Sequence, residues 1–209
     1  WWKKGCKSLK ISVLGAGAFG TAIAITMARG GRDVMLWGRD TNSISQIKKT
    51  RINNSYLPDV PLPEELKITD DLKEALSSDI ICLTVPMQRL TALLSLFDVE
   101  MAHRSLVACC KGIDLVTNVG PTSIVKNYFP NSIVAVLTGP SFALDIAKGL
   151  PTALTLGCTN SDDGERLQQS LSTKNLRIYR TTDVLGAELG GALKNVVAIA
   201  CGVAIGAGY

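Results

Sequence analysis

Short apolar runs alternate along the chain with segments that have the length and pattern of helices. Runs rich in β-branched residues predict strands at residues 10–15, 33–38, 79–86, 105–112, 132–140, 152–158 and 176–181. The intervening segments predict helices at residues 19–30, 42–51, 72–76, 88–96, 121–129, 143–149 and 161–171. The strands are almost continuously apolar, as in a sheet that is covered on both faces. The alternation therefore predicts an α/β fold with a doubly wound, mainly parallel sheet.

The pattern changes near Val184, where a glycine- and alanine-rich helical segment begins and no strand follows. We therefore predict one α/β domain over residues 1–182 and the first helix of a helical second domain over residues 183–209. The most apolar part of this segment, residues 196–209, is shorter than the about 20 residues that a membrane span requires. No membrane span is predicted.

Composition narrows the class of protein. The chain is 46% hydrophobic and 19% charged, which is typical of a folded globular protein. Its net charge of +4 comes from scattered basic residues, so we predict no nucleic-acid partner. The six cysteines have no metal-ligand spacing, which favours reduced core thiols in the cytoplasm and no metal site. The basic start of the chain lacks the apolar segment of a secretion signal, and Trp1 and Trp2 mark either a contact surface or a poorly ordered arm.

A glycine-rich motif, "GAGAFG" at residues 15–20, follows the first predicted strand and opens the first predicted helix. In this context the motif is typical of a Rossmann-type dinucleotide site. Gly15 permits a tight turn, Gly17 lets the backbone approach a pyrophosphate, and Gly20 lets the helix pack closely on the strand. The N-terminus of the helix then offers free N–H groups to the phosphates.

The second predicted strand ends in "LWGRD", where two residues bear on the choice of cofactor. Asp40 has the spacing from the glycine motif of an acid that holds the ribose 2′-hydroxyl of NAD. Arg39 instead suits the 2′-phosphate of NADP, and the sequence leaves NAD and NADP open. A solvated turn is the alternative for both residues.

Polar residues follow two later strands, at Lys111 and at Gly139–Pro140–Ser141. Ligands of doubly wound sheets bind at the carboxyl ends of the strands, so these residues are placed to meet a small anionic substrate. A lysine after a strand is more often simply exposed. The single histidine, His103, lies in a polar turn and is predicted to face solvent.

Lys194 interrupts the apolar stretch "ELGGALKNVVAIACG" at residues 188–202. Lysine is rarely fully buried, so a lysine within such an apolar stretch marks a candidate functional residue. Gly190 and Gly191, one turn earlier, are expected to leave room for a substrate or nicotinamide. The alternative is a lysine that extends from the helix edge to solvent.

The motifs "GAGAFGTAIA", "NNSYLPDVPLP", "CCKGI", "GPSFALDIAKGLPTA" and "ELGGALKNVVAIACG" resemble, in this order, those of NAD(P)-dependent glycerol-3-phosphate dehydrogenases. The resemblance runs from about Lys10 to Gly208. It implies reversible reduction of dihydroxyacetone phosphate to sn-glycerol 3-phosphate, which supplies phospholipid synthesis, with NAD or NADP. The sequence leaves the oligomeric state open, with a homodimer as one alternative. It implies cofactor contacts at Ala18, Phe19, Arg39, Lys111 and Ala143. It also implies substrate contacts at Lys111, Gly139, Ser141 and Lys194, with Lys194 as the catalytic proton-handling residue.

The chain departs from the family pattern in two ways. Ala18 stands where the family often has serine, which removes a hydroxyl contact to a phosphate. Family members also continue beyond this point with a helical domain that holds the substrate phosphate. Two alternatives therefore remain open, namely a nucleotide-binding module without catalysis and a dehydrogenase of another small hydroxy acid.

Overall fold

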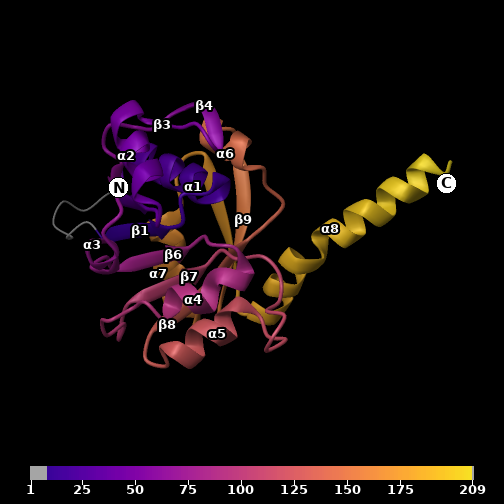
Figure 1. Cartoon of the computed structure of the whole chain (residues 1–209). Coiled ribbons are helices and arrows are strands. Elements are labelled where there is room, and N and C mark those ends of the chain that lie inside the picture. Colours follow the sequence, from indigo (N-terminus) through magenta and orange to yellow (C-terminus); the bar gives the residue numbers. More distant parts are fainter. Residues whose placement is uncertain (1–8, 209) are drawn as a thin grey trace.

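The computed structural model describes residues 9–208, and its centre is an eight-stranded sheet with helices on both faces (Figure 1). In spatial order the strands are β10 (Leu176–Thr181), β9 (Thr152–Cys158), β8 (Ile133–Thr138), β7 (Ser105–Ala108), β6 (Ile80–Leu83), β1 (Lys10–Leu14), β2 (Asp33–Trp37) and β5 (Lys67–Thr69). Strands β8 to β5 are parallel, which confirms the predicted doubly wound sheet. The predictions about Trp1 and Trp2 lie outside the described residues.

The helices form two layers, and each layer covers its own apolar core. They are α1 (Ala18–Arg29), α2 (Thr41–Thr50), α3 (Leu72–Leu76), the short 3₁₀ helix η1 (Met87–Arg89), α4 (Leu90–Leu94), α5 (Pro121–Tyr128), α6 (Ala143–Lys148), α7 (Ser161–Leu171) and α8 (Val184–Gly206). Ile11 and Val13 of β1 pack with α1, α2, α6 and α7, whereas Leu14 packs with α3, α4 and α5. Because successive side chains of a strand point to opposite faces, the apolar strand sequence supplies both cores.

Strands β9 and β10 run against the rest of the sheet, since β8 pairs antiparallel with β9 and β9 pairs parallel with β10. The reversal follows from the position of α6, which packs on α1 instead of crossing the sheet. The Thr26 hydroxyl donates to the Ile146 carbonyl at 3.2 Å, and the Arg29 guanidinium donates to the Ala147 carbonyl at 2.6 Å. The chain therefore re-enters the sheet at the edge where β8 ended.

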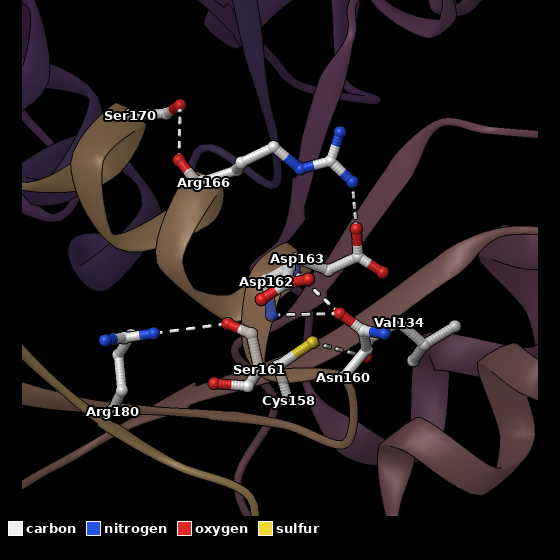
Figure 2. Close-up of polar contacts among 9 residues, drawn as sticks. All are labelled: Val134, Cys158, Asn160, Ser161, Asp162, Asp163, Arg166, Ser170 and Arg180. Carbon is white, nitrogen blue, oxygen red and sulfur yellow. Dashed lines mark hydrogen bonds and ion pairs between the residues drawn. The ribbon is translucent and has the colours of Figure 1, made fainter.

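The turn from β9 into α7 is held by side-chain contacts (Figure 2). The Asn160 side chain accepts hydrogen bonds from the backbone N–H groups of Asp162 and Asp163, both at 2.9 Å, and so caps α7. The Cys158 thiol lies 3.8 Å from the Val134 carbonyl of β8. The reversed edge of the sheet is thus tied to its central part.

Several elements differ from the predicted ones. The proline-rich segment forms a small antiparallel pair, β3 (Ile52–Asn53) with β4 (Leu57–Pro61), and β5 was not predicted because three residues carry little pattern. The predicted helix over residues 88–96 divides into η1 and α4. The strand predicted over residues 105–112 ends at Ala108, where the chain leaves the sheet toward Lys111.

Helix α8 begins on the sheet and then projects from it (Figure 1). Its first turns lie against β8 and β9, and the backbone N–H of Gly186 donates to the Asp183 side chain at 2.8 Å. Its apolar side chains beyond this contact are exposed, by 52% at Leu193 and 74% at Ile205. The 23-residue helix is long and apolar enough to cross a membrane by length and composition alone.

Candidate functional site

The glycine motif forms a tight turn between β1 and α1. Gly15 has φ +127°, which favours glycine, and its N–H donates to the Trp37 carbonyl at 2.9 Å. A Cβ on Gly20 would lie 2.0 Å from the Gly15 carbonyl oxygen, so α1 can pack this closely only without a side chain there. A Cβ on Gly17 would have no heavy atom within 4 Å. The structure thus gives Gly15 and Gly20 structural roles and leaves Gly17 facing open space.

Two polar residues that the sequence pattern did not single out brace this turn. The Asn53 amide donates to the Ala16 carbonyl at 2.9 Å and to the Thr21 hydroxyl at 2.8 Å. The Thr84 hydroxyl, from the segment after β6, lies 3.0 Å from the Gly15 carbonyl. Both residues are remote from the motif in sequence, so only their position in the fold shows their role.

A cavity of about 300 Å³ opens beside the glycine turn. It is lined by Gly15, Ala16, Gly17, Trp37, Gly38, Arg39, Asp40, Ser43, Ile44, Tyr56, Val85, Pro86, Arg89, Ala92, Leu93 and Leu96. Most of its wall is apolar, and the charged side chains are Arg39, Asp40 and Arg89. A flat apolar wall with a few polar groups suits a nucleoside.

Asp40 has a structural role in addition to its place in this cavity. Its carboxylate accepts a 2.6 Å hydrogen bond from the backbone N–H of Ser43 and so caps α2. This hydrogen bonding lowers the pKa of the Asp40 carboxyl group, and the neighbouring Arg39 lowers it further. Asp40 is therefore an anion beside Arg39, and its contact with a ribose remains a prediction.

At the other end of the turn, residues from three parts of the chain meet. The Lys111 ammonium group lies 5.4 Å from the centre of the Phe19 ring, within range of a cation–π interaction. Desolvation by the surrounding protein lowers the pKa of Lys111, and the positive charge of Lys194 lowers it further. The segment after β7 thus places Lys111 against the first turn of α1, near enough to Lys194 of α8 for the two charges to interact.

The carboxyl end of β8 completes this region. The hydroxyl oxygens of Thr138 and Ser141 are buried and have no hydrogen-bond partner among residues 9–208. Gly139 packs against Leu154, and Ala143 is the first residue of α6, partly buried against the core. Buried hydroxyl groups are normally hydrogen-bonded, so the unpaired Ser141 hydroxyl after β8 suits a polar ligand, whereas the Thr138 hydroxyl faces Gly191 of α8.

The space expected beside Gly191 is filled by protein. A Cβ on Gly191 would lie 2.4 Å from the Thr138 hydroxyl oxygen, whereas a Cβ on Gly190 would have nothing within 4 Å. The prediction that Gly191 clears room for a ligand is therefore wrong. Gly191 lets α8 approach β8 closely, which places Lys194 one turn further along the helix.

Glu188 is a further residue whose role the sequence analysis missed. Its side chain is only 9% exposed, and its carboxylate accepts a 2.8 Å hydrogen bond from the backbone N–H of Thr122. Helix α5 has Gly120 at its N-cap position and no cap from its own segment, so Glu188 supplies that cap. A Cβ on Gly120 would lie 2.2 Å from the carboxylate. This contact joins the start of α8 to the loop that follows Lys111.

A larger cavity, about 650 Å³, lies beside the amino end of β8, between α5, α7 and α8. The Glu188 carboxylate and the Asn160 side chain in its wall are already hydrogen-bonded to backbone N–H groups. Of the three buried hydroxyl groups without a hydrogen-bond partner among residues 9–208, that of Ser12 lies within β1, whereas those of Thr138 and Ser141 lie at the carboxyl end of β8. The unpaired polar groups therefore favour the glycine-turn side of the molecule, rather than this larger cavity, as the ligand site.

The residues present fit a nicotinamide dinucleotide. The open face of Gly17 is the cradle that a pyrophosphate needs, and the neighbouring cavity accommodates a nucleoside. Lys111, Lys194 and the orphan Ser141 hydroxyl lie at the other end, where a small anionic substrate would meet the nicotinamide.

Comparisons with known proteins agree with this arrangement. The family model described as the N-terminus of NAD-dependent glycerol-3-phosphate dehydrogenase matches residues 10–163, and the model of its C-terminus matches residues 183–209. The chain is 51% identical over 199 residues to a glycerol-3-phosphate dehydrogenase [NAD(P)+] of Ruegeria sp., covering 95% of this chain and 62% of the relative. It is 52% identical over 199 residues to the enzyme of that name from Roseobacter denitrificans, with the same coverage.

Solved structures show the same likeness. The crystal structure of glycerol-3-phosphate dehydrogenase from Coxiella burnetii superimposes with a TM-score of 0.83 at 34% identity, over 95% of this chain and 62% of that chain. The enzyme structure from Dunaliella salina gives a TM-score of 0.84 at 26% identity, over 97% of this chain and 38% of that chain. The chain therefore spans less than two thirds of the length of these proteins.

Proposed function

Because the chain belongs to the NAD-dependent glycerol-3-phosphate dehydrogenase family, we propose that its protein interconverts dihydroxyacetone phosphate and sn-glycerol 3-phosphate with NAD or NADP. The observation that carries this proposal is the position of Lys111 over the Phe19 ring at the first turn of α1, where the charge of Lys194 also acts on it. Two cations at the nicotinamide end suit a phosphorylated substrate that gains negative charge on oxygen during reduction. The product would supply phospholipid synthesis.

The cofactor, when bound, supplies or accepts the hydride, and the chain's residues bind and orient the reactants. Gly15, Gly17 and Gly20 shape the turn for the pyrophosphate, with Ala18 and Phe19 in the first turn of α1 next to it. Ala143 opens α6, which packs on α1, and is a proposed contact of the cofactor. Arg39 belongs to the nucleoside cavity.

Lys194 is the proposed general acid. It lies partly buried on α8, close enough to Lys111 to lower the pKa of that residue. A proton donor within hydrogen-bond reach of the carbonyl oxygen typically contributes about 10²–10⁴-fold to the rate. Lys111, Gly139 and Ser141 are the proposed substrate contacts, and the Ser141 hydroxyl has no competing partner among the described residues.

We place the domain boundary near residue 183, so residues 1–182 form the cofactor domain and residues 183–209 begin the helical domain. The exposed apolar side chains of α8 support this division, since an apolar helix normally packs against another element. A homodimer is part of the same proposal, and sedimentation of the full-length protein tests it. A reducing cytoplasmic location agrees with four buried free thiols, and cell fractionation tests it.

Turnover by the full-length protein tests the reaction. We expect activity with dihydroxyacetone phosphate and little with keto-acids that lack a phosphate. Lys194→Ala should lower kcat by about 10²–10⁴-fold while the affinity for NADH changes little. Activity restricted to unphosphorylated keto-acids would favour a dehydrogenase of another hydroxy acid.

The 209-residue chain gives a second test. It should bind NADH or NADPH in calorimetry and turn over poorly, because remote contacts to the substrate phosphate contribute to rate as well as affinity. Cofactor binding together with a full-length protein that shows no turnover would identify a nucleotide-binding module without catalysis.

A further inference from the structure

Two arginine side chains reach the nucleoside cavity from different sides of β1. Arg39 follows β2 and Arg89 lies on η1, which follows β6, and β2 and β6 are the two neighbours of β1 in the sheet. Both arginines line the cavity of about 300 Å³. Both are exposed, and within residues 9–208 neither guanidinium makes a hydrogen bond or an ion pair. The guanidinium donors are therefore available to a ligand.

Arg89 lies on the same helix face as other residues that line the cavity. Ala92 and Leu93 line the same cavity from α4, which directly follows η1, and Leu96 lines it from beyond the end of α4. Positions three and four residues apart lie on one face of a helix, so the face that carries Arg89 is the one turned to the cavity. Its place there follows from the packing of α4, in which Leu93 and Leu94 are buried.

The charges of the cavity show why a second arginine matters. Arg39 lies beside Asp40, which is held as an anion by its hydrogen bond with Ser43. The charges of Arg39 and Asp40 offset each other, so this pair alone gives a neutral end to the cavity. With Arg89 the three charged side chains that line the cavity sum to +1, which favours a phosphate group there.

We propose that Arg89 determines specificity for the adenosine 2′-phosphate of NADP(H), acting with Arg39 on the same group. The inference rests on the proposed function only in requiring a dinucleotide at the glycine turn. The pyrophosphate is served by the open face of Gly17 and the N-terminus of α1, so the arginines remain for the 2′ position. Apolar side chains such as Leu93 and Ile44 provide the surface for the base.

Calorimetry of the 209-residue chain with two small probes tests this inference, because neither probe needs a substrate domain. Adenosine 2′,5′-bisphosphate carries the 2′-phosphate, and AMP lacks it. We expect Arg89→Gln to weaken binding of the bisphosphate about tenfold and binding of AMP less than threefold, about the effect of one charge-assisted hydrogen bond. Higher salt should narrow the difference, since the site is open to solvent.

Lys49→Gln is the matched control, because it removes one positive charge from the exposed side of α2, away from the cavity. It should leave both affinities within about twofold of the parent chain. Arg39→Gln combined with Arg89→Gln should abolish the preference for the bisphosphate. An equal loss of AMP and bisphosphate in Arg89→Gln would show that Arg89 stacks on the base, and no change in either would show that it has no role in the site.

These outcomes are distinct from failure of the proposed function. If the parent chain binds AMP and NADH but Arg89→Gln does not change the preference between probes, the inference is wrong and the dinucleotide site stands. If the parent chain binds no adenine nucleotide, the proposed cofactor site itself is wrong.

Discussion

The Glu188 carboxylate caps helix α5 through a 2.8 Å hydrogen bond from the backbone N–H of Thr122, which is 66 residues earlier in the chain. Gly120 leaves the space that this carboxylate occupies. The contact ties the helix that carries Lys194 to the loop that carries Lys111. The relative position of the two lysines therefore depends on a residue that touches neither ligand nor lysine.

Replacing Glu188 tests this coupling. Glu188→Ala should lower the free energy of unfolding by about 1–2 kcal/mol, because α5 loses its cap and a charge-assisted hydrogen bond. Glu188→Gln keeps an acceptor oxygen and should lose less. Urea denaturation of the two variants and the parent chain measures the difference, and equal loss in both would show that the charge itself, rather than the hydrogen bond, carries the effect.

The glycine turn offers a matched pair of substitutions. Gly17→Val should reduce NADH affinity at least tenfold and lower the free energy of unfolding by only about 1 kcal/mol, because its Cβ meets open space and the cost is that of valine at the N-cap position of α1. Gly20→Ala should destabilise the fold by about 2–3 kcal/mol, because its Cβ would overlap the Gly15 carbonyl. Calorimetry and urea denaturation separate the two effects. Full NADH affinity in Gly17→Val would move the cofactor away from this turn.

The apolar pattern predicted most of the sheet and its helices because continuous β-branched runs specify buried strands over several residues. The same pattern missed β5, whose three residues are too few, and the reversal of β9, which depends on where α6 packs. At the site, the glycine motif identified its own turn, since each glycine has a local steric role. The roles of Asn53 and Glu188 were not predictable, because both act on backbone groups that are distant in sequence.

The different surroundings of the neighbouring residues Gly190 and Gly191 could not be predicted from the sequence either. Gly190→Ala should stabilise the chain by about 0.5–1 kcal/mol, the gain in helix propensity, because its Cβ meets nothing. Gly191→Ala should instead destabilise it, because its Cβ would press on the Thr138 hydroxyl.

The double variant Gly191→Ala with Thr138→Ala identifies the cause of this loss. Removing the hydroxyl should restore part of the stability that Gly191→Ala loses, and urea denaturation of the four chains measures the coupling. Strictly additive effects would mean that the two residues do not press on each other.

Lys111 gives a prediction that depends on pH. Desolvation and then the charge of Lys194 lower the pKa of Lys111 from its ordinary value of 10.5, so between the lowered pKa and 10.5 the unfolded chain binds more protons than the folded chain. The free energy of unfolding should therefore rise with pH across that window, and below it the cost of the charged lysine is present in full. Lys111→Met should be at least as stable as the parent chain at neutral pH, and this advantage should disappear above pH 10.5.

The effect of the Lys194 charge on the pKa of Lys111 can be separated from the effect of desolvation. Lys194→Met removes the neighbouring charge and leaves desolvation in place, so the pKa of Lys111 should rise toward 10.5 without reaching it. Nuclear magnetic resonance titration of ¹³C-labelled lysine side chains, with Lys111→Met to assign the signal, measures the shift. An unchanged pKa of Lys111 in Lys194→Met would mean that the two ammonium groups are not close in solution. The proposed pairing of Lys111 and Lys194 around one substrate would then lose its structural basis.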